Sequence, residues 1–309
     1  MKRFALAVHG GAGPDSNHIK ENMDGYKQGL EDALNAGYAI LEKGGSAVDA
    51  VEAAVNSMEN NPLFNAGRGG ALNEKAESQM CASIADGKRH KFGAVAIVKN
   101  VKNPVSLAKA VMEKTGHIYL GGPGALSFAQ EIKAPLEPDA YFITEHQYES
   151  YAEAHEKKSK NPQQAAKEQV ESRMHGTVGA VALDSHGNLA AATSTGGTEH
   201  EKEGRIGDSS MVGVGTYANN DTCAISTTGD GEYAIKHTAA FHISAIMEYK
   251  GLSLPDAIQF FMDEKFKGEK GDIGLIAIDR HGQVSFRFKA DRMHRGCRTS
   301  AGEMMVEIY

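Results

Sequence analysis

A threonine at position 177 stands where the chemical character of the chain changes. Residues 156–176 are almost entirely polar, whereas the apolar segment 177–183 begins with this threonine. If the chain were cut after Gly176, Thr177 would gain a free α-amine with a pKa of about 7.7 to 8.0. Its hydroxyl would then be a nucleophile and its amine a general base, so no separate histidine would be needed. The structural alternative is an ordinary threonine that starts a strand.

The bond between Gly176 and Thr177 could also be cut by the threonine itself. Attack of the hydroxyl on the Gly176 carbonyl would transfer the acyl group from nitrogen to oxygen, and water would hydrolyse the resulting ester. Glycine has no side chain and therefore offers this attack little steric resistance. The pattern is consistent with an amide-cleaving enzyme that matures by cutting its own chain.

Residues that could bind a substrate follow in three glycine-rich clusters, at 193–197, 204–209 and 226–232. Arg205 and Asp208 could clamp a zwitterion, because a guanidinium binds a carboxylate through two parallel hydrogen bonds and a carboxylate accepts from an ammonium. An amino-acid-like substrate would suit this pair. A salt bridge between the two side chains within their loop is the structural alternative.

Thr228 and Gly229 precede a predicted helix. A hydroxyl and a backbone N–H at this point could donate to a developing oxyanion, an interaction worth about 3 kcal/mol per donor. A simple helix cap is the alternative interpretation.

These residues need a scaffold that brings distant segments together, and the apolar pattern predicts its elements. The first half of the chain predicts strands at 4–8 and 92–98 and helices at 19–43 and 105–114. Ser46 predicts the start of a further helix, because its hydroxyl can accept a hydrogen bond from the first turn.

Two segments of the second half have the same design. An apolar run, a turn containing Asp, His and Gly, and another apolar run occur at 177–195 and again at 274–288, and each predicts a β-hairpin. Between them, residues 231–249 and 253–266 have the pattern of helices. Strands in runs and helices in pairs favour helix layers outside a central double sheet.

Composition and charge exclude several classes of partner. The formal net charge of −7 leaves no basic surface for nucleic acid or for an anionic membrane. No run approaches the roughly 18 apolar residues of a membrane span. The 3 cysteines and 13 histidines lack the spacing of a disulfide framework or a metal site. We therefore expect a cytoplasmic protein with small-molecule or protein partners.

Six motifs in this order resemble one family, the plant-type L-asparaginases, also called isoaspartyl aminopeptidases, of the N-terminal-nucleophile hydrolases. The resemblance covers nearly the whole chain. It rests on HGGAG (9–13), NPLFNAG (61–67), GTVGAVALD (176–184), TSTGG (193–197), GRIGDS (204–209) and TGDGE (228–232).

The resemblance implies an α+β fold, the four-layer αββα sandwich, with two packed and mainly antiparallel sheets. The chain would be a single domain over 1–309, self-cleaved into an α subunit, 1–176, with an exposed linker from about 156 to 176, and a β subunit, 177–309. Two cleaved copies would assemble as (αβ)2. The mature enzyme would hydrolyse isoaspartyl (β-aspartyl) dipeptides and L-asparagine through an acyl-enzyme, without a cofactor for catalysis.

The resemblance also implies roles for matching positions. Thr177 would be nucleophile and general base, and the hydroxyl of Thr195 would support it. Arg205 and Asp208 would hold the α-carboxylate and the α-amino group of the substrate.

Two oxyanion sites are implied as well. Thr228 and Gly229 would stabilise the oxyanion formed from the substrate. Asn65 would lie near the scissile bond, where its amide could donate to the oxyanion formed when the Gly176 carbonyl is attacked during self-cleavage.

The family pattern further implies a structural sodium ion held by backbone carbonyls, which suit a hard cation. The matching positions are Met58, Glu59, Asn61, Phe64, Ala66 and Arg68.

Two places depart from the family pattern. Cys81 stands where relatives usually have Asp, so a support of the site is altered. Residues 198–203 replace a stretch that commonly carries Asn-Lys, just ahead of Arg205, and their acidity could tune which leaving groups are accepted.

Two other functions are compatible with part of the pattern. A glycosylasparaginase-like amidase would share the nucleophile, but a protein of that class would be expected to have a signal peptide and disulfides. An uncleaved, non-catalytic amino-acid-binding protein would keep the clamp of Arg205 and Asp208, and an intact bond before Thr177 would favour it.

Overall fold

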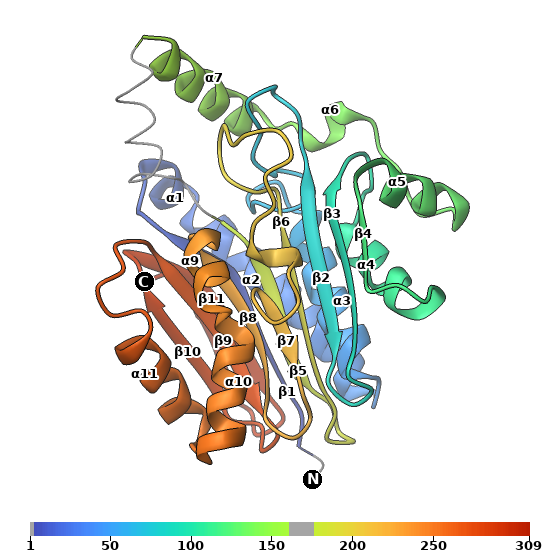
Figure 1. Ribbon diagram of the computed structural model, residues 1–309, viewed down its shortest axis with the longest axis vertical. Coiled ribbons are helices and arrows are strands. Elements are labelled where there is room, and N and C mark those ends of the chain that lie inside the picture. The colour runs from blue at the N-terminus through green and yellow to red at the C-terminus, as the bar shows by residue number, and fades with distance from the viewer. Residues whose placement is uncertain (1–2, 161–175) are drawn as a thin grey trace.

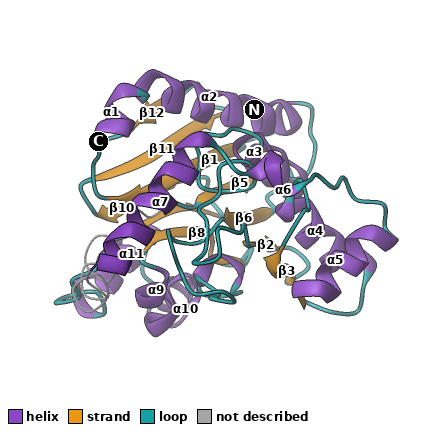
Figure 2. Cartoon of the chain, turned by 90° about the horizontal axis from the view of Figure 1, so that it is seen from above, coloured by secondary structure: helices purple, strands orange, loops and turns teal. Residues whose placement is uncertain are grey.

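Two β-sheets lie face to face, with helices on both outer surfaces (Figure 1). The structure is a computed structural model that describes residues 3–160 and 176–309. Viewed from above, the strands form the middle of the molecule and helices lie above and below them (Figure 2). The predicted α+β fold, a four-layer αββα sandwich, is confirmed.

The larger sheet joins strands from both ends of the chain. Its strands are β1 (Ala5–Gly13), β2 (Met80–Asp86), β3 (Lys91–Val98), β4 (Tyr119–Gly121), β5 (Val178–Leu183), β6 (Leu189–Thr195), β11 (Arg292–Thr299) and β12 (Met304–Glu307). Among the described residues their order is β12-β11-β1-β5-β6-β2-β3-β4. The neighbours are antiparallel except for β3 and β4. The predicted hairpin at 177–195 therefore lies in the middle of this sheet.

The smaller sheet belongs wholly to the part of the chain after Thr177. Its strands are β7 (Thr216–Ala218), β8 (Cys223–Gly229), β9 (Ile273–Asp279) and β10 (Val284–Lys289). Their order is β10-β9-β8-β7, and all three pairings are antiparallel. The hairpin predicted at 274–288 is the pair β9–β10.

Each sheet has its own helix layer. The larger sheet is covered by α1 (Asn17–Glu21), α2 (Met23–Glu42), α3 (Ala47–Glu59), α4 (Pro104–Lys114) and α5 (Gly122–Glu131). The smaller sheet is covered by α9 (Gly231–His237), α10 (Ala239–Lys250) and α11 (Leu254–Glu264). Two further helices, α6 (Asp139–Phe142) and α7 (Glu145–Lys160), lie at the upper end of the molecule in Figure 1.

Buried apolar side chains fill all three interfaces between the layers. Leu34 of α2 and Val51 of α3 pack on the larger sheet, whereas Phe261 of α11 packs on the smaller one. Val181 and Ile276 lie between the two sheets. Full burial of such a side chain contributes about 1.5 to 3 kcal/mol. Both faces of β5 are covered, which explains its unbroken apolar sequence.

Most predicted helix ends agree with the structure. Ser46 caps α3 by accepting from the Asp49 N–H at 3.1 Å. The helix predicted at 19–43 is interrupted at Asn22, which separates α1 from α2. The helix predicted at 231–249 is interrupted at Thr238, whose φ of 48° is left-handed and ends the hydrogen-bonding of α9.

The predicted exposed linker begins within a helix. Residues 156–160 are the last turn of α7, and none of the side chains of this helix is buried. The rest of the predicted linker, 161–175, lies outside the described residues.

Candidate active site

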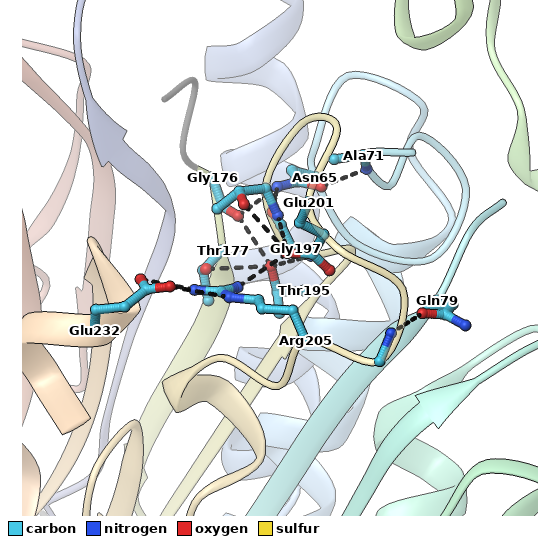
Figure 3. Close-up of polar contacts among 12 residues, drawn as sticks. Asn65, Ala71, Gln79, Gly176, Thr177, Thr195, Gly197, Glu201, Arg205 and Glu232 are labelled. Carbon is cyan, nitrogen blue, oxygen red and sulfur yellow. Dashed lines mark hydrogen bonds and ion pairs between the residues drawn. The ribbon is translucent and has the colours of Figure 1, made fainter. Parts of the chain in front are cut away.

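Thr177 lies directly before β5, at the end of the sheet where that strand begins. Its side chain is buried, with 5% exposed. Its hydroxyl donates to Thr195 Oγ1 at 3.3 Å (Figure 3). Thr195 is the last residue of the neighbouring strand β6, so the hairpin register brings the two threonines together.

The carbonyl of Gly176 accepts two hydrogen bonds. Asn65 Nδ2 donates to it at 2.7 Å and Thr195 Oγ1 at 3.1 Å. Donors already aimed at a carbonyl oxygen stabilise the negative charge that develops when a nucleophile attacks the carbon, and they need no rearrangement at that moment. The carbonyl of the bond that the sequence predicts to be cut therefore has two donors on its oxygen and lies beside the hydroxyl of Thr177.

Both donors are themselves held in place. The amide of Asn65 also donates to Gly197 O at 2.7 Å and accepts from Ala71 N at 2.7 Å. The Gly197 N–H donates to Thr195 Oγ1 at 3.0 Å, which orients the Thr195 hydroxyl toward the Gly176 carbonyl. Figure 3 shows these contacts converging on one point between β5, β6 and the loop of Asn65.

The glycine loop after His9 also touches the scissile bond. Gly11 has a φ of +114°, and a Cβ on it would lie 2.9 Å from the Cα of Gly176. Any other residue at position 11 would be strained and would displace Gly176. The HGGAG motif is thus required for close approach of two backbones.

A small pocket, with a cavity volume of about 10 Å³, opens beside Thr177. It is lined by Gly176, Thr177, Thr195, Gly197, Thr198, Arg205, Asp208, Ser209 and Gly229. The structure thus gathers in one pocket most of the residues to which the sequence pattern pointed. Thr228 is buried next to Gly229 but does not line the pocket, and its hydroxyl accepts from Ala12 N at 3.3 Å.

Arg205 and Asp208 do not form the loop salt bridge that was the structural alternative. Arg205 Nη2 contacts Glu232 Oε2 at 2.9 Å, and its Nη1 contacts Glu201 Oε2 at 3.2 Å (Figure 3). Asp208 instead accepts from Thr227 Oγ1 at 2.8 Å. Burial raises the pKa of Asp208, while the Thr227 hydroxyl and Arg205 lower it.

Glu201 and Glu232 received no role from the sequence, although both lay within the motifs or departures noted there. Glu201 is buried and accepts from the backbone N–H of Thr198 at 2.8 Å. Burial raises its pKa, and Arg205 lowers it. The spacing of Glu201 and Arg205, four residues apart in an acidic segment, was the available signal for this ion pair.

Comparison with known proteins places the chain in a family. The family described as asparaginase matches residues 2–308. The chain belongs to the asparaginase family. A probable isoaspartyl peptidase/L-asparaginase 2 of Arabidopsis thaliana is 41% identical, over 100% of both chains. The isoaspartyl peptidase of Escherichia coli (strain K12) is 40% identical over 100% of this chain and 97% of its own. An isoaspartyl peptidase/L-asparaginase of Mus musculus is 43% identical over 90% and 83%.

Cys81 occupies a sensitive position for a member of the asparaginase family. It pairs with Thr195 in the register of β2 and β6, so it lies directly beside the residue that holds the scissile carbonyl. Its side chain is buried, and burial raises the pKa of the thiol. A neutral thiol therefore stands where a carboxylate was expected.

Three backbone carbonyls of the loop after α3 are only partly used as hydrogen-bond acceptors. The carbonyls of Glu59, Asn61 and Phe64 each accept one backbone N–H, at 2.7, 3.2 and 2.9 Å. A carbonyl has two lone pairs, so each keeps one for a hard cation. In residues 3–160 and 176–309, no cluster of three His, Cys, Asp or Glu side chains could hold a metal. A site in this loop would depend on carbonyls, as the asparaginase family pattern implies.

Proposed function

We propose that this chain is the precursor of an amidohydrolase that cuts itself between Gly176 and Thr177 and then hydrolyses β-aspartyl dipeptides and L-asparagine. The observation that carries the proposal is the Gly176 carbonyl, which accepts from Asn65 and Thr195 beside the Thr177 hydroxyl. Relatives named isoaspartyl peptidase/L-asparaginase support the substrate class.

Self-cleavage begins with attack of Thr177 Oγ1 on the Gly176 carbon. Asn65 and Thr195 stabilise the oxyanion, and the C–N bond then breaks as the nitrogen of Thr177 takes up the proton that its hydroxyl has lost. The product is an ester between Gly176 and the threonine hydroxyl. Water hydrolyses it to a Gly176 carboxylate and frees both the amine and the hydroxyl of Thr177.

Substrate hydrolysis reuses the freed threonine. The α-amine of Thr177 takes the hydroxyl proton while Oγ1 attacks the side-chain amide carbon of the substrate. Thr228 and Gly229 are the proposed donors to the substrate oxyanion. The amine then gives its proton to the leaving nitrogen, and water releases aspartate from the acyl-enzyme.

The amino-acid end of the substrate binds Arg205 and Asp208. Both line the pocket beside Thr177, which supports this assignment. The substrate carboxylate competes with Glu232 for the guanidinium, because Arg205 already contacts that carboxylate. The side chain of Glu232 is 51% exposed and can swing into water at low cost. Asp208 accepts from the substrate ammonium.

Denaturing electrophoresis with N-terminal sequencing tests the proposal. The purified protein should give two bands, one starting at Thr177, and Thr177→Ala should give a single uncut band without activity. Hydrolysis of L-asparagine and of β-aspartyl-leucine should accompany the cut. An uncut wild-type band with full activity would overturn the mechanism, and an uncut, inactive protein that binds aspartate would support the binding-protein alternative.

We further propose that the chain is a single domain and that two cleaved copies form (αβ)2 in the cytoplasm. Family membership supports the assembly, and three buried free thiols fit a reducing compartment. Light scattering should give the mass of two cleaved copies. In the described residues, no helix has the length and apolarity needed to cross a bilayer.

A structural sodium ion is proposed for the loop of Met58, Glu59, Asn61, Phe64, Ala66 and Arg68. The ion would neutralise converging carbonyl dipoles and stiffen the loop that carries Asn65. It would take no part in the reaction itself. Replacing sodium by choline in the buffer should lower the melting temperature, and an unchanged temperature would contradict the site.

A further inference from the structure

A second, partly enclosed pocket lies near the Gly176–Thr177 bond, with a cavity volume of about 60 Å³. Gly176 lines this pocket as well as the one beside Thr177, so the two cavities meet at the bond that is cut. Asn65 is also in its wall, together with Arg292 and His294 of β11. The proposed function uses neither of these last two residues.

Arg292 is a buried charge without an ion pair to any residue that the structure describes. It is 5% exposed, and its Nε donates to the carbonyl of Pro14 at 3.1 Å. In the described part of the chain, no carboxylate lies within 4.0 Å of its guanidinium. The carboxylates of Asp15 and Asp272 act on it only from farther away, and Asp15 is itself paired with Lys20 at 2.9 Å. A buried cation without a counter-ion at contact distance is costly, and an anionic ligand would offset that cost.

His294 adds no second positive charge to this pocket. Its Nε2 lies 3.4 Å from Arg292 Nη1. Burial and the neighbouring guanidinium lower the pKa of His294 to about 3, so the ring is neutral near pH 7. Arg292 keeps its proton in proteins and is therefore the cation of this pocket. One carboxylate, Glu199, also lines the pocket.

The chemistry of the leaving group determines which part of a substrate reaches this pocket. The α-amine of Thr177 must pass a proton to the leaving nitrogen, so the two nitrogens must be within hydrogen-bond reach. In the precursor, the position next to the Thr177 nitrogen is filled by Gly176. Once the bond is cut and Gly176 has moved, the leaving group takes that space and continues into the second pocket.

We propose that Arg292 determines specificity by binding the free α-carboxylate of the amino acid that leaves from a β-aspartyl dipeptide. The inference deepens the proposed function and rests on it. Ile19, Tyr26 and Leu63 line the same pocket and favour an apolar side chain on that amino acid, such as leucine. L-asparagine releases only ammonia and makes no contact with Arg292.

Three substrates test this: β-aspartyl-leucine, its C-terminal amide, and L-asparagine. The cleaved wild-type enzyme should have a kcat/KM for the acid at least about 10-fold above that for the amide, because only the acid forms a charge-assisted pair. Arg292→Met should lose this preference, with a roughly 30-fold lower kcat/KM for the acid and asparagine activity within about 2-fold. Arg292→Lys should keep part of the preference.

Arg295→Met is the matched control, since Arg295 lies on the same strand but does not line the pocket. It should keep the wild-type ratio of acid to amide. A wild-type enzyme without that preference would overturn the inference, and this holds even if Arg292→Met fails to mature.

Two further outcomes would also count against Arg292. An equal loss for all three substrates would assign it to the Gly176 carboxylate of the chain itself. Activity on asparagine alone would overturn both the dipeptide substrate and Arg292. A cleaved wild-type enzyme inactive on every substrate would instead overturn the proposed function, which is a different result.

Discussion

Two arginines line the two pockets that share Gly176, and their charges are balanced in opposite ways. Arg205, in the pocket beside Thr177, contacts the carboxylates of Glu201 and Glu232. Arg292, in the pocket beyond Gly176, has no carboxylate at ion-pair distance within the described chain. A paired guanidinium exchanges one carboxylate for another when substrate binds, so its net gain is small and its main contribution is geometry. An unpaired guanidinium gains a counter-ion when an anionic substrate binds.

This difference in charge balance indicates that the two pockets bind different parts of a substrate. Every substrate of the proposed enzyme has the aspartyl half, for which Arg205 and Asp208 are the proposed binding residues. Only dipeptides have a second carboxylate, for which the pocket of Arg292 is proposed. Gly176 lines both pockets, so the proposed self-cleavage would connect them.

The largest effect is expected from Asn65, which lines the second pocket and donates to the carbonyl of Gly176, the residue that the two pockets share. Asn65→Ala removes one of the two donors to the Gly176 carbonyl, and loss of such a donor typically costs about 100- to 1000-fold in rate. Freshly purified protein sampled over days on denaturing gels would give the rate of self-cleavage. Cleavage at the wild-type rate would contradict the oxyanion role.

Arg205→Met should break the first pocket without touching the second. We expect kcat/KM to fall at least about 100-fold for L-asparagine and for β-aspartyl-leucine alike, since both lose the charge-assisted contact to the α-carboxylate. Arg292→Met should spare asparagine. Steady-state kinetics on fully cleaved enzyme would compare them, and a loss confined to one substrate in the Arg205 variant would refute this difference between the pockets.

Glu232→Gln should sharpen the difference by making Arg205 more like Arg292. With this competitor neutral, the KM for L-asparagine should fall by about two- to fivefold, an effect in the range of exposed ion pairs. Glu269→Gln is a suitable control, because Glu269 pairs with Lys236 outside the pocket. A higher KM in the Glu232 variant would mean that this carboxylate positions the guanidinium instead of competing for it.

The smallest effect on either pocket is expected from Glu59, a buried acid of α3. Burial raises its pKa from 4.5 to about 7, so the folded chain binds this proton more tightly than the unfolded chain does. Its contribution to the free energy of unfolding is complete below pH 4.5 and is lost as the pH rises through 7, a total of about 3 kcal/mol.

Urea unfolding between pH 4.5 and 7.5 measures this dependence. Both proteins should be uncut Thr177→Ala precursors, so that a single chain unfolds. Glu59→Gln cannot titrate, and its stability should fall less over this range than that of the parent. Parallel curves would show that Glu59 keeps an ordinary pKa in the folded state.

Local sequence patterns predicted much of the fold, because each of these elements depends on residues within one short segment. The hairpins at 177–195 and 274–288, the cap at Ser46 and the layered α+β class follow from apolar periods and turn residues, and each agrees with the structure. The breaks at Asn22 and Thr238 were missed, because the apolar period continues through both positions while the backbone does not.

The contacts within the site join residues that are far apart in the sequence, and local patterns do not predict them. A hydroxyl residue at the change from a polar to an apolar segment, with a glycine before it, pointed to Thr177. The family pattern pointed to Asn65. Nothing local relates Asn65 to Gly176, which are 111 residues apart, or Arg292 to Pro14, which are 278 apart. Such contacts depend on sheet order and on how loops pack at the end of the strands.

The amino-acid sequence by itself therefore determined which chemical groups are available and where the chain could be cut. Only the tertiary structure decided how the charges are balanced: Glu201 and Glu232 on Arg205, and no carboxylate at contact distance from Arg292 in the described residues. The physical reason is that ion pairing falls off within a few ångströms, whereas sequence spacing constrains distance only within one element.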